Sequence, residues 1–481
     1  MTNLVGREHE IKQLMNLYKS KSSQFVVVYG RRRVGKTFLI DEALSGKITF
    51  RHAGLSPVEK STGKNQTQQQ LKHFYNSLIM HGASKSHCPR NWLEAFLMLE
   101  IFLQSNDCGK RQVVFLDELP WMDTAKSGFM TAFEGFWNNW ACHRRNLMLI
   151  VCGSATSWIQ NKLIDNYGGL YNRITARPIH LKPFTLKECE EFYHSKNIRM
   201  SQYDIVQSYM IYGGIPYYMN LLETGRSLNQ NVNATFFAKD AILKDEFVRL
   251  FSSVFSNPQA MIAIVRTLNQ RHSGYTRAEL LKKTGLKNNG DFSFMLKALI
   301  ASNFVEKYVP FGLGTRNAHY RLIDTFCRFY LNFVEGKTSL PTDFWQGDAS
   351  QQIVTWRGIT FEDVCQNHIS QIKHALGISG LTTKESSWAY RGDDETDGTQ
   401  IDLLIERPDH VMNACEIKFY SDDFVVDKSY NRVLNHRKSL LSKQLPKRYV
   451  VHQTLITTYG LKYNEYSNDF DNVVTMKDLL L

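Results

Sequence analysis

The sequence predicts an α/β protein in which a parallel sheet comes first, mainly helical segments follow, and a second α/β segment ends the chain. Two observations carry this prediction. The apolar, β-branched run Phe25–Tyr29 enters a glycine-containing loop and then an amphipathic helix, as a buried parallel strand does. Further on, the apolar runs Ile401–Ile405 and Val411–Ile417 flank a turn-like Arg-Pro-Asp-His stretch, as the strands of a hairpin do. The 481 residues suffice for about three domains of ordinary size.

The composition is that of a globular protein with an anionic partner. Hydrophobic residues make up 43% and charged residues 22%, which argues against disorder. Lys and Arg number 58 against 46 Asp and Glu, so nucleic acid or nucleotide is the expected partner, unless the surface is merely basic. The eight cysteines form no Cys-x-x-Cys pair, and no apolar run reaches the ~18–20 residues of a membrane span. We therefore expect a reduced, soluble, cytoplasmic protein with no membrane partner.

The loop after the first strand has the spacing of a phosphate-binding loop (P-loop), Gly30-x4-Gly35-Lys36-Thr37. Its glycines allow backbone N–H groups to surround a triphosphate at the helix N-terminus, while Lys36 reaches the β and γ phosphates and the Thr37 hydroxyl binds magnesium. Arg31–Arg33 either add positive potential there or point to solvent. The expected nucleotide contacts in this stretch are Gly30, Arg33, Val34, Gly35, Lys36, Thr37 and Phe38.

Two further strand ends supply the polar groups that a P-loop needs. The apolar run Val113–Leu116 ends in Asp117 and Glu118. We expect Asp117 to hold Mg²⁺ through water and Glu118 to act as the general base that polarises the attacking water. The third strand, LMLIVCGSA, ends in Ser154, whose hydroxyl either senses the γ-phosphate or caps a helix.

The motifs LVGREHEIKQL, GRRRVGKT, VVFLDELPWMD, LIVCGSATSWI and YGGIPYYMNLL resemble the prokaryotic P-loop ATPases of the AAA+/STAND-related group. The resemblance implies ATP and Mg²⁺ as cofactors. It implies that Gly6 and Arg7 lie against the nucleotide base, and that Gly214-Ile215-Pro216 comes from a helical lid, with Pro216 near the adenine. The implied boundaries are 1–180 for the ATPase core and 181–255 for the lid.

Arg173 and Arg177 stand where a hydrolysing AAA+ enzyme places its arginine finger. Such a guanidinium acts on the γ-phosphate of a neighbouring subunit, so Arg173 as a catalytic residue implies a homo-oligomer. Both arginines are equally compatible with salt-bridged surface positions.

Residues 256–340 are expected to form a winged helix-turn-helix. Three short amphipathic helices are separated by Gly274 and Gly285, Thr276 is a plausible cap, and a hairpin surrounds Gly312-Leu313-Gly314. Residues 255–335 hold eleven Lys and Arg against five Asp and Glu, which favours contact with phosphates. In the DNA-binding interpretation, DNA being favoured over RNA, the contacts come from Asn288, Asn289, Ser293 and Arg316. The alternative is a module that only packs or binds partners.

The last segment, expected at 345–481 after a Ser/Thr/Gly/Pro-bearing linker, contains three charges in a hairpin. A single helix is expected over residues 356–377 and a strand around SSWAY. If the turn is centred on Asp409, Asp402 lies opposite Glu416, and the two carboxylates repel unless a cation lies between them. Lys418 shares the strand face of Glu416.

The pattern Asp402-x13-Glu416-x-Lys418 resembles the catalytic motif of the PD-(D/E)XK nucleases. The resemblance implies a metal-dependent phosphodiesterase in which Asp402 and Glu416 bind the metal, Glu362 supplies a third acidic ligand and Lys418 stabilises developing charge. Ile401 replaces the proline of the family name. The alternative is a surface ion pair between Glu416 and Lys418 beside a solvated Asp402.

Two hypotheses follow for the whole chain. The first is an enzyme with an ATPase and a metal-dependent nuclease joined by a DNA-contacting winged helix. The second is a regulatory switch in which ATP changes conformation or assembly and the last domain only binds DNA or partners. On the first hypothesis, replacing either Asp402 or Glu416 relieves repulsion and raises stability.

Overall fold

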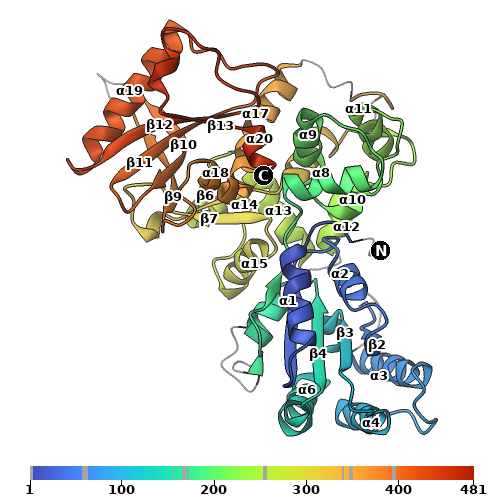
Figure 1. Cartoon of the computed structure of the whole chain (residues 1–481). Helices are drawn as coiled ribbons and strands as arrows, with labels where there is room; N and C mark the ends of the chain where they lie inside the picture. Colours follow the sequence, from blue (N-terminus) through green and yellow to red (C-terminus); the bar gives the residue numbers. More distant parts are fainter. Residues whose placement is uncertain are drawn as a thin grey trace. The chain divides into compact units, whose positions relative to one another are not determined.

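The computed structural model describes residues 4–56, 63–154, 156–164, 170, 173–252, 257–337, 341–345, 350–392 and 397–481 (Figure 1). The chain divides into two compact units, Met1–Lys182 and Pro183–Leu481. The second unit contains the segments expected as lid, winged helix and C-terminal domain.

The first unit is built on a five-stranded parallel sheet, which confirms the predicted α/β class. Its strands are β1 (Gln24–Tyr29), β2 (Ile48–Ala53), β3 (Gln112–Asp117), β4 (Leu147–Gly153) and β5 (Ile179–His180). They pair in the order β2-β3-β4-β1-β5, so that β4 lies between β1 and β3. Every residue of β3 and β4 is buried, because helices cover both faces of a parallel sheet.

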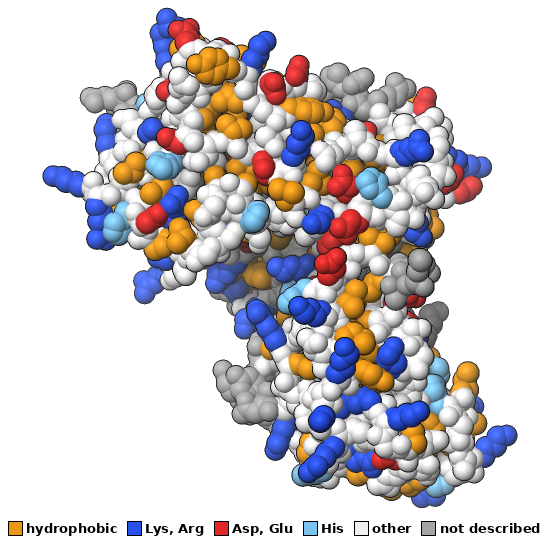
Figure 2. Space-filling view, viewed as in Figure 1, with side chains coloured by type: hydrophobic (Ala, Val, Ile, Leu, Met, Phe, Trp, Pro, Cys, Tyr) orange, Lys and Arg blue, Asp and Glu red, His pale blue; other side chains and the backbone are white. Residues whose placement is uncertain are grey.

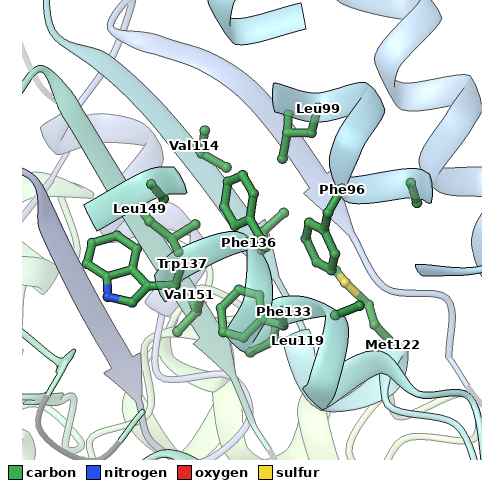
Figure 3. Packing of buried hydrophobic residues seen from close by; sticks show 14 of the residues in the cluster. Phe96, Leu99, Val114, Leu119, Met122, Phe133, Phe136, Trp137, Leu149 and Val151 are labelled. Carbon is green, nitrogen blue, oxygen red and sulfur yellow. The ribbon is translucent and has the colours of Figure 1, made fainter. Parts of the chain in front are cut away.

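The helices of this unit pack aromatic side chains against the sheet. They are α1 (Glu8–Tyr18), α2 (Lys36–Ala43), α3 (Gly63–Met80), α4 (Trp92–Ser105), α5 (Leu119–Met122), α6 (Phe129–Gly135) and α7 (Thr156–Ile159). Phe96 of α4 stacks on Phe136 at 5.2 Å between ring centroids, and Trp137 packs on Phe25 of β1 at 5.0 Å. Figure 3 shows Phe96, Phe136 and Trp137 among Val114, Leu149 and Val151 of the central strands. This packing fixes the strand ends that carry the polar residues described below.

The basic surplus of the protein is concentrated in the first unit. Residues 1–182 contain 24 Lys and Arg against 13 Asp and Glu, whereas residues 183–481 contain 34 against 33. On the face of the first unit shown in Figure 2, basic side chains are widespread and acidic ones are few. An attraction for anions is therefore expected mainly there.

The second unit begins with the helices α8 (Leu186–Ser195), α9 (Gln202–Tyr212), α10 (Pro216–Met219), α11 (Leu228–Val232) and α12 (Glu246–Ser252). Three more helices follow, α13 (Pro258–Asn269), α14 (Arg277–Thr284) and α15 (Gly290–Ala301), with a small antiparallel sheet in the order β6-β8-β7. Its strands are β6 (Tyr275–Thr276), β7 (Val305–Tyr308) and β8 (His319–Leu322). Thr276 caps α14 in a capping box with Glu279, as its position before RAELLKK predicts.

The prediction of a linker before the last segment is wrong at Trp345. This side chain is 1% exposed and packs edge-on against Phe329 and Phe333 of α16 (Thr325–Phe333) and against Trp356. Asn233 also bonds both the backbone N–H and the carbonyl of Trp345. The rest of the expected linker lies partly outside the described residues.

The last segment is a five-stranded mixed sheet in the order β13-β12-β11-β10-β9. Its strands are β9 (Lys384–Tyr390), β10 (Thr399–Glu406), β11 (Val411–Lys418), β12 (Val450–Thr457) and β13 (Asn472–Thr475). The antiparallel hairpin of β10 and β11 has the predicted register, with Leu403 opposite Cys415, and β11 and β12 are parallel and joined through α19 (Lys428–Gln444). A short helix, α20 (Met476–Leu479), follows β13.

The single helix expected over 356–377 is two helices, α17 (Gln351–Asn367) and α18 (Ile369–Ala375). The break falls at the buried His368, whose Nδ1 lies 2.8 Å from the Val364 carbonyl oxygen and whose Nε2 accepts a hydrogen bond from the Leu186 N–H. A contact distant in sequence therefore overrides local helix periodicity.

A buried ion pair fixes α17 within the second unit. Arg328 Nε of α16 lies 2.6 Å from Asp363 Oδ2 of α17, and both side chains are at most 4% exposed. His272 Nε2 lies 3.2 Å from the other carboxylate oxygen. Burial alone would raise the pKa of Asp363, but Arg328 and His272 together lower it.

Replacing Asp363 with alanine is expected to lower the free energy of unfolding by about 3–5 kcal/mol, because Arg328 stays buried without its counter-charge. Urea denaturation measures the change. The matched control is Glu335→Ala, which removes the partly exposed Arg266–Glu335 pair and is expected to cost only about 0–1 kcal/mol. Equal effects of the two substitutions would contradict the structural role given to Asp363.

None of the helices in the described part of the chain has the length and apolar character needed to cross a membrane.

Candidate functional site

The P-loop between β1 and α2 is shaped by residues in the left-handed backbone region. Gly30 has φ +152°, and a Cβ there would lie 2.2 Å from the Leu181 carbonyl oxygen. Gly35 has φ +89° and no atom within 4 Å of its Cβ position, so a residue with a side chain there would be disfavoured by the backbone conformation alone. Arg33 also has φ +72°. The two glycines of the motif are thus required for different reasons, one by close packing and one by loop conformation.

The Lys36 side chain is held within the loop that it follows. Its ammonium donates hydrogen bonds to the carbonyl oxygens of Gly30 at 3.0 Å and Arg31 at 2.9 Å, and the residue is 6% exposed. A buried cation beside the N-terminus of α2 is the arrangement that binds phosphate. Phe38, one turn into the helix, is 46% exposed, whereas Val34 is buried.

Thr37, at the start of α2, contacts Asp117, at the end of β3, although β1 and β3 are not adjacent in the sheet. Thr37 Oγ1 donates to Asp117 Oδ2 at 2.8 Å. The β2-β3-β4-β1-β5 order brings the ends of β1 and β3 to the same sheet edge, with β4 between them. A hydroxyl and a carboxylate in contact are the oxygen donors that Mg²⁺ prefers, so these residues fit the expected cation.

Glu118 is held by the residue that directly follows β4, the strand between β1 and β3. Its backbone has φ +44°, a costly conformation for a non-glycine residue. One carboxylate oxygen, Oε2, accepts hydrogen bonds from both the N–H and the hydroxyl of Ser154, each at 3.0 Å. Ser154 therefore orients the proposed general base, a role not foreseen from the sequence.

The remaining predicted nucleotide contacts lie in both units. Gly6 and Arg7 have φ +64° and +61° before α1, and Arg7 donates to the Lys182 carbonyl at 2.7 Å, so its guanidinium stabilises the end of the first unit. Pro216 begins α10 in the second unit, after Gly214, where a Cβ would lie 2.6 Å from the Phe184 carbonyl oxygen. These positions remain predictions as nucleotide contacts.

Both candidate finger arginines belong to the first unit, and Arg173 and Arg177 are exposed. Exposure is what a residue acting on a neighbouring subunit requires.

Comparison with known families decides the nature of the N-terminal part. Residues 4–222 match the family described as "ATPase domain predominantly from Archaea". This segment is an archaeal-type ATPase domain. The family match confirms the predicted P-loop and the nucleotide-binding class of the chain.

Known proteins that match a larger part of the chain have low sequence identity to it. An uncharacterized protein of Methanocaldococcus jannaschii is 24% identical over 408 residues, which cover 83% of each chain. Among solved structures, a Walker-type ATPase of Pyrococcus abyssi is 16% identical, with a TM-score of 0.47 and coverage of 68% of this chain and 96% of that one. The ORC2 protein of Aeropyrum pernix, solved with ADPNP and ADP, is 12% identical, with a TM-score of 0.34 and coverage of 75% and 95%.

Outside the archaeal-type ATPase domain, the charges of the C-terminal hairpin form a connected cluster. Glu416 Oε1 lies 2.8 Å from Lys418 Nζ, as expected for residues on one strand face. Two residues of α19 approach the same carboxylate: Tyr430 donates its hydroxyl to Glu416 Oε1, and Arg437 pairs with Oε2. The Glu416 side chain is 12% exposed. The ion pair of the alternative interpretation is therefore present, but its Glu416 side chain is largely buried rather than at the surface.

Asp402 lies at an irregular point of β10. The pairing of β10 with β9 shifts between Ile401 and Leu404, and the ladder with β11 is regular from Leu403. The pKa of Asp402 is raised to about 6, first by burial and then by the negative charges of Glu362 and Glu416. The three predicted acidic ligands therefore lie close enough to influence one another.

Glu362 is engaged by a residue from another segment. His272, in the turn after α13, places Nδ1 3.2 Å from Glu362 Oε2. Burial would lower the pKa of His272, but Asp363 and Glu362 raise it to about 9. Imidazolium is thus the form that faces Glu362 at neutral pH.

No group of three or more His, Cys, Asp or Glu side chains among the described residues is arranged to hold a metal. The predicted ligands Glu362 and Glu416 are paired with cationic side chains, His272, Lys418 and Arg437. His272, Tyr430 and Arg437 were not foreseen. Tyr430 and Arg437 are seven residues apart on one helix face, but nothing in the sequence indicates which strand that face meets.

Two of the residues predicted to contact DNA make bonds within the protein. Asn289 caps α15 by accepting from the Phe292 N–H at 3.1 Å, and Asn288 accepts from Arg277 at 2.9 Å. Arg316, between β7 and β8, is exposed, and Ser293 is partly buried on α15.

Proposed function

We propose that the protein hydrolyses ATP in its first unit and that its second unit binds nucleic acid and cleaves phosphodiester bonds in the presence of Mg²⁺. The contact between Thr37 and Asp117 supports the first activity. The observation that carries the second is the cluster of Asp402, Glu416 and Lys418, in which Glu416 and Lys418 touch on one strand face beside Asp402, a partly buried acid of raised pKa.

At the ATP site, the side chains of the chain itself have separate tasks. Lys36 neutralises charge on the β and γ phosphates, and the oxygens of Thr37 and Asp117 would hold Mg²⁺, which neutralises further phosphate charge when bound. Glu118, oriented by Ser154, polarises the attacking water. No covalent intermediate is needed, because phosphoryl transfer to water depends mainly on positioning and charge.

At the C-terminal cluster, Glu362, Asp402 and Glu416 carry oxygen donors of the type that Mg²⁺ prefers, but the described side chains are not gathered around one cation position, so binding would require them to rearrange. A bound Mg²⁺ would polarise the scissile phosphate. Burial would lower the pKa of Lys418, but Glu416 raises it overall, so the ammonium stays charged. A charged Lys418 is suited to stabilise negative charge on the phosphate. To take a cation, Glu416 would have to exchange part of its contact with Arg437 or Tyr430.

The three helices α13–α15 with the β6-β8-β7 sheet support a winged helix as the nucleic-acid contact, with DNA favoured over RNA. Arg316, between β7 and β8, would contact the phosphate backbone of the nucleic acid. Because Asn288 and Asn289 are engaged within the protein, nonspecific contact is favoured over base recognition.

The alternative is the ATP-driven switch, and the pairing of Glu416 with Lys418 and Arg437 favours it, because this pairing satisfies the carboxylate without a metal. The test is incubation of the protein with plasmid and single-stranded DNA in Mg²⁺ or Mn²⁺. Cleavage supports the nuclease. Absence of cleavage in every divalent ion, together with ATP-dependent changes in particle size, supports the switch.

We expect Arg173 to act between subunits of a homo-oligomer. Arg173→Ala should lose ATP hydrolysis, because the γ-phosphate of the neighbour loses a cation. Adding excess Lys36→Ala protein, which keeps Arg173, should partly restore hydrolysis in mixed assemblies. Steady-state phosphate release and particle size measure both. Assembly without rescue would assign Arg173 a structural role.

A further inference from the structure

The second unit contains a pocket of about 780 Å³ that the proposed activities do not use. Its lining residues come from α9, the start of α11, the start of α17 and the loop after β11. Its volume is within the range of sites that bind small molecules or nucleotide-sized groups. Its lining includes Arg199, Tyr203, Asp204, Arg357, Phe419 and Tyr420.

Aromatic rings form one side of the pocket. Tyr203 stacks on Phe419 with ring centroids 4.9 Å apart and planes within 20°. Phe361 of α17 supports Phe419 from another side at 5.3 Å. Tyr420, next along the chain, is 48% exposed, and its ring rests edge-on against Phe424 at 5.3 Å. Tyr420 thus presents aromatic surface to the pocket on a supported ring.

The backbone of Tyr420 is also fixed. Its N–H donates to Thr458 Oγ1 at 3.1 Å, and the same hydroxyl donates back to the Tyr420 carbonyl oxygen. A ligand that stacks on this ring would lose little free energy in ordering it.

The pocket adjoins the carboxylate cluster through the chain itself. Phe419 directly follows Lys418 at the end of β11, and Phe361 directly precedes Glu362 on α17. At about 3.3 Å per residue in extended chain, Tyr420 lies within roughly 7 Å of Lys418, measured between Cα atoms. A strand bound in the pocket would therefore lie near the proposed cleavage site.

The charges of the lining suit a phosphate backbone on one side. Arg199 and Arg357 contribute guanidinium groups. Asp204 is the opposing charge; its carboxylate accepts from the Ser201 hydroxyl at 2.8 Å and from the Gln207 amide at 3.4 Å. Phosphates are expected beside the arginines and away from Asp204, where an amino group of a base is the compatible neighbour.

We propose that this pocket binds a segment of single-stranded nucleic acid, with a base stacked on Tyr420 and phosphates beside Arg199 and Arg357. Stacking platforms combined with cationic side chains are the general means of binding unpaired strands. A base-paired duplex presents only its groove edges and backbone, so it offers no free ring face to Tyr420. As a route to the cleavage site, the inference rests on the proposed nuclease, but binding itself is measurable without cleavage.

The test is fluorescence anisotropy with a labelled oligodeoxycytidylate, whose bases carry an amino group, in EDTA without ATP, so that neither hydrolytic site acts. Tyr420→Ala is expected to weaken binding roughly 5- to 150-fold, the range for loss of one stacked base, and Tyr420→Phe to restore it. Tyr463→Ala, which removes an 83% exposed tyrosine elsewhere in the unit, is the control and should bind like the native protein. Arg199→Ala, at an exposed position, should weaken binding and reduce its salt dependence.

Native affinity in both Tyr420→Ala and Arg199→Ala would overturn the proposal and place strand binding elsewhere, for example on the basic first unit. Should Tyr420→Ala fail to fold, Arg199→Ala alone decides. If the native protein cuts nothing but Tyr420→Ala loses binding, the pocket stands and the nuclease fails. If the native protein cuts and both variants bind normally, the nuclease stands and the pocket proposal fails.

Discussion

Replacing Lys36 with alanine is expected to abolish ATP binding, whereas Glu118→Gln should keep binding and lose turnover. The Lys36 ammonium is buried and fixed by the carbonyls of Gly30 and Arg31, so its removal deletes the cation that meets the β and γ phosphates. Glutamine at 118 keeps the shape of the side chain but removes a general base, a loss of roughly 100- to 10,000-fold in turnover. Binding of a fluorescent ATP analogue and steady-state phosphate release separate the two effects.

Ser154→Ala is the matched control for this prediction. It leaves the Glu118 carboxylate in place but removes one of the two hydrogen bonds that orient it, so turnover should fall less than in Glu118→Gln, with binding unchanged. An unchanged rate of hydrolysis in both Lys36→Ala and Glu118→Gln would remove ATP hydrolysis from the proposed function.

Asp402→Asn, Glu416→Gln and Lys418→Ala are each expected to abolish divalent-dependent cleavage and to leave ATP hydrolysis intact, because Lys36, Thr37 and Glu118 belong to the other unit. Their effects on stability should differ. Asp402→Asn should raise the melting temperature at neutral pH, because burial and neighbouring carboxylates make the charged form of Asp402 unfavourable.

Glu416→Gln, in contrast, should lower the melting temperature, because Lys418 and Arg437 lose a largely buried counter-charge. The expectation that replacing either acid raises stability is therefore kept for Asp402 only, because Glu416 also balances Lys418 and Arg437. Thermal denaturation with and without Mn²⁺ measures both effects. A cluster with only a structural role would give the same stability changes but no metal-induced stabilisation of the native protein.

The arrangement of the residues around the P-loop was predictable because its determinants are local. Strand β1, the loop and α2 are consecutive, and each of β3 and β4 has its polar residues directly after an apolar run. The sequence does not specify that β4 lies between β1 and β3, so it left the role of Ser154 open between phosphate sensor and helix cap. The register of the β10–β11 hairpin was likewise predictable, since a short turn fixes which residues face each other.

The partners of the C-terminal carboxylates were not predictable, because they come from separate elements. His272 reaches Glu362 from a turn in the middle of the chain, and Arg437 reaches Glu416 from a helix that crosses between β11 and β12. The prediction of Trp345 as a linker residue was wrong for the same reason. Its polar neighbours in sequence indicate a loop, whereas its contacts with Phe329 and Trp356 are tertiary. Local composition reports little about such contacts.

The most direct measurement is DNA cleavage and ATP hydrolysis on the same samples of native protein and Glu416→Gln, with Mg²⁺ or Mn²⁺. We predict that the native protein performs both reactions and that Glu416→Gln retains ATP hydrolysis but cuts no DNA. Equal cleavage by the two proteins, or no cleavage by the native protein with any divalent ion, would contradict the assignment of a second hydrolytic site to Asp402, Glu416 and Lys418.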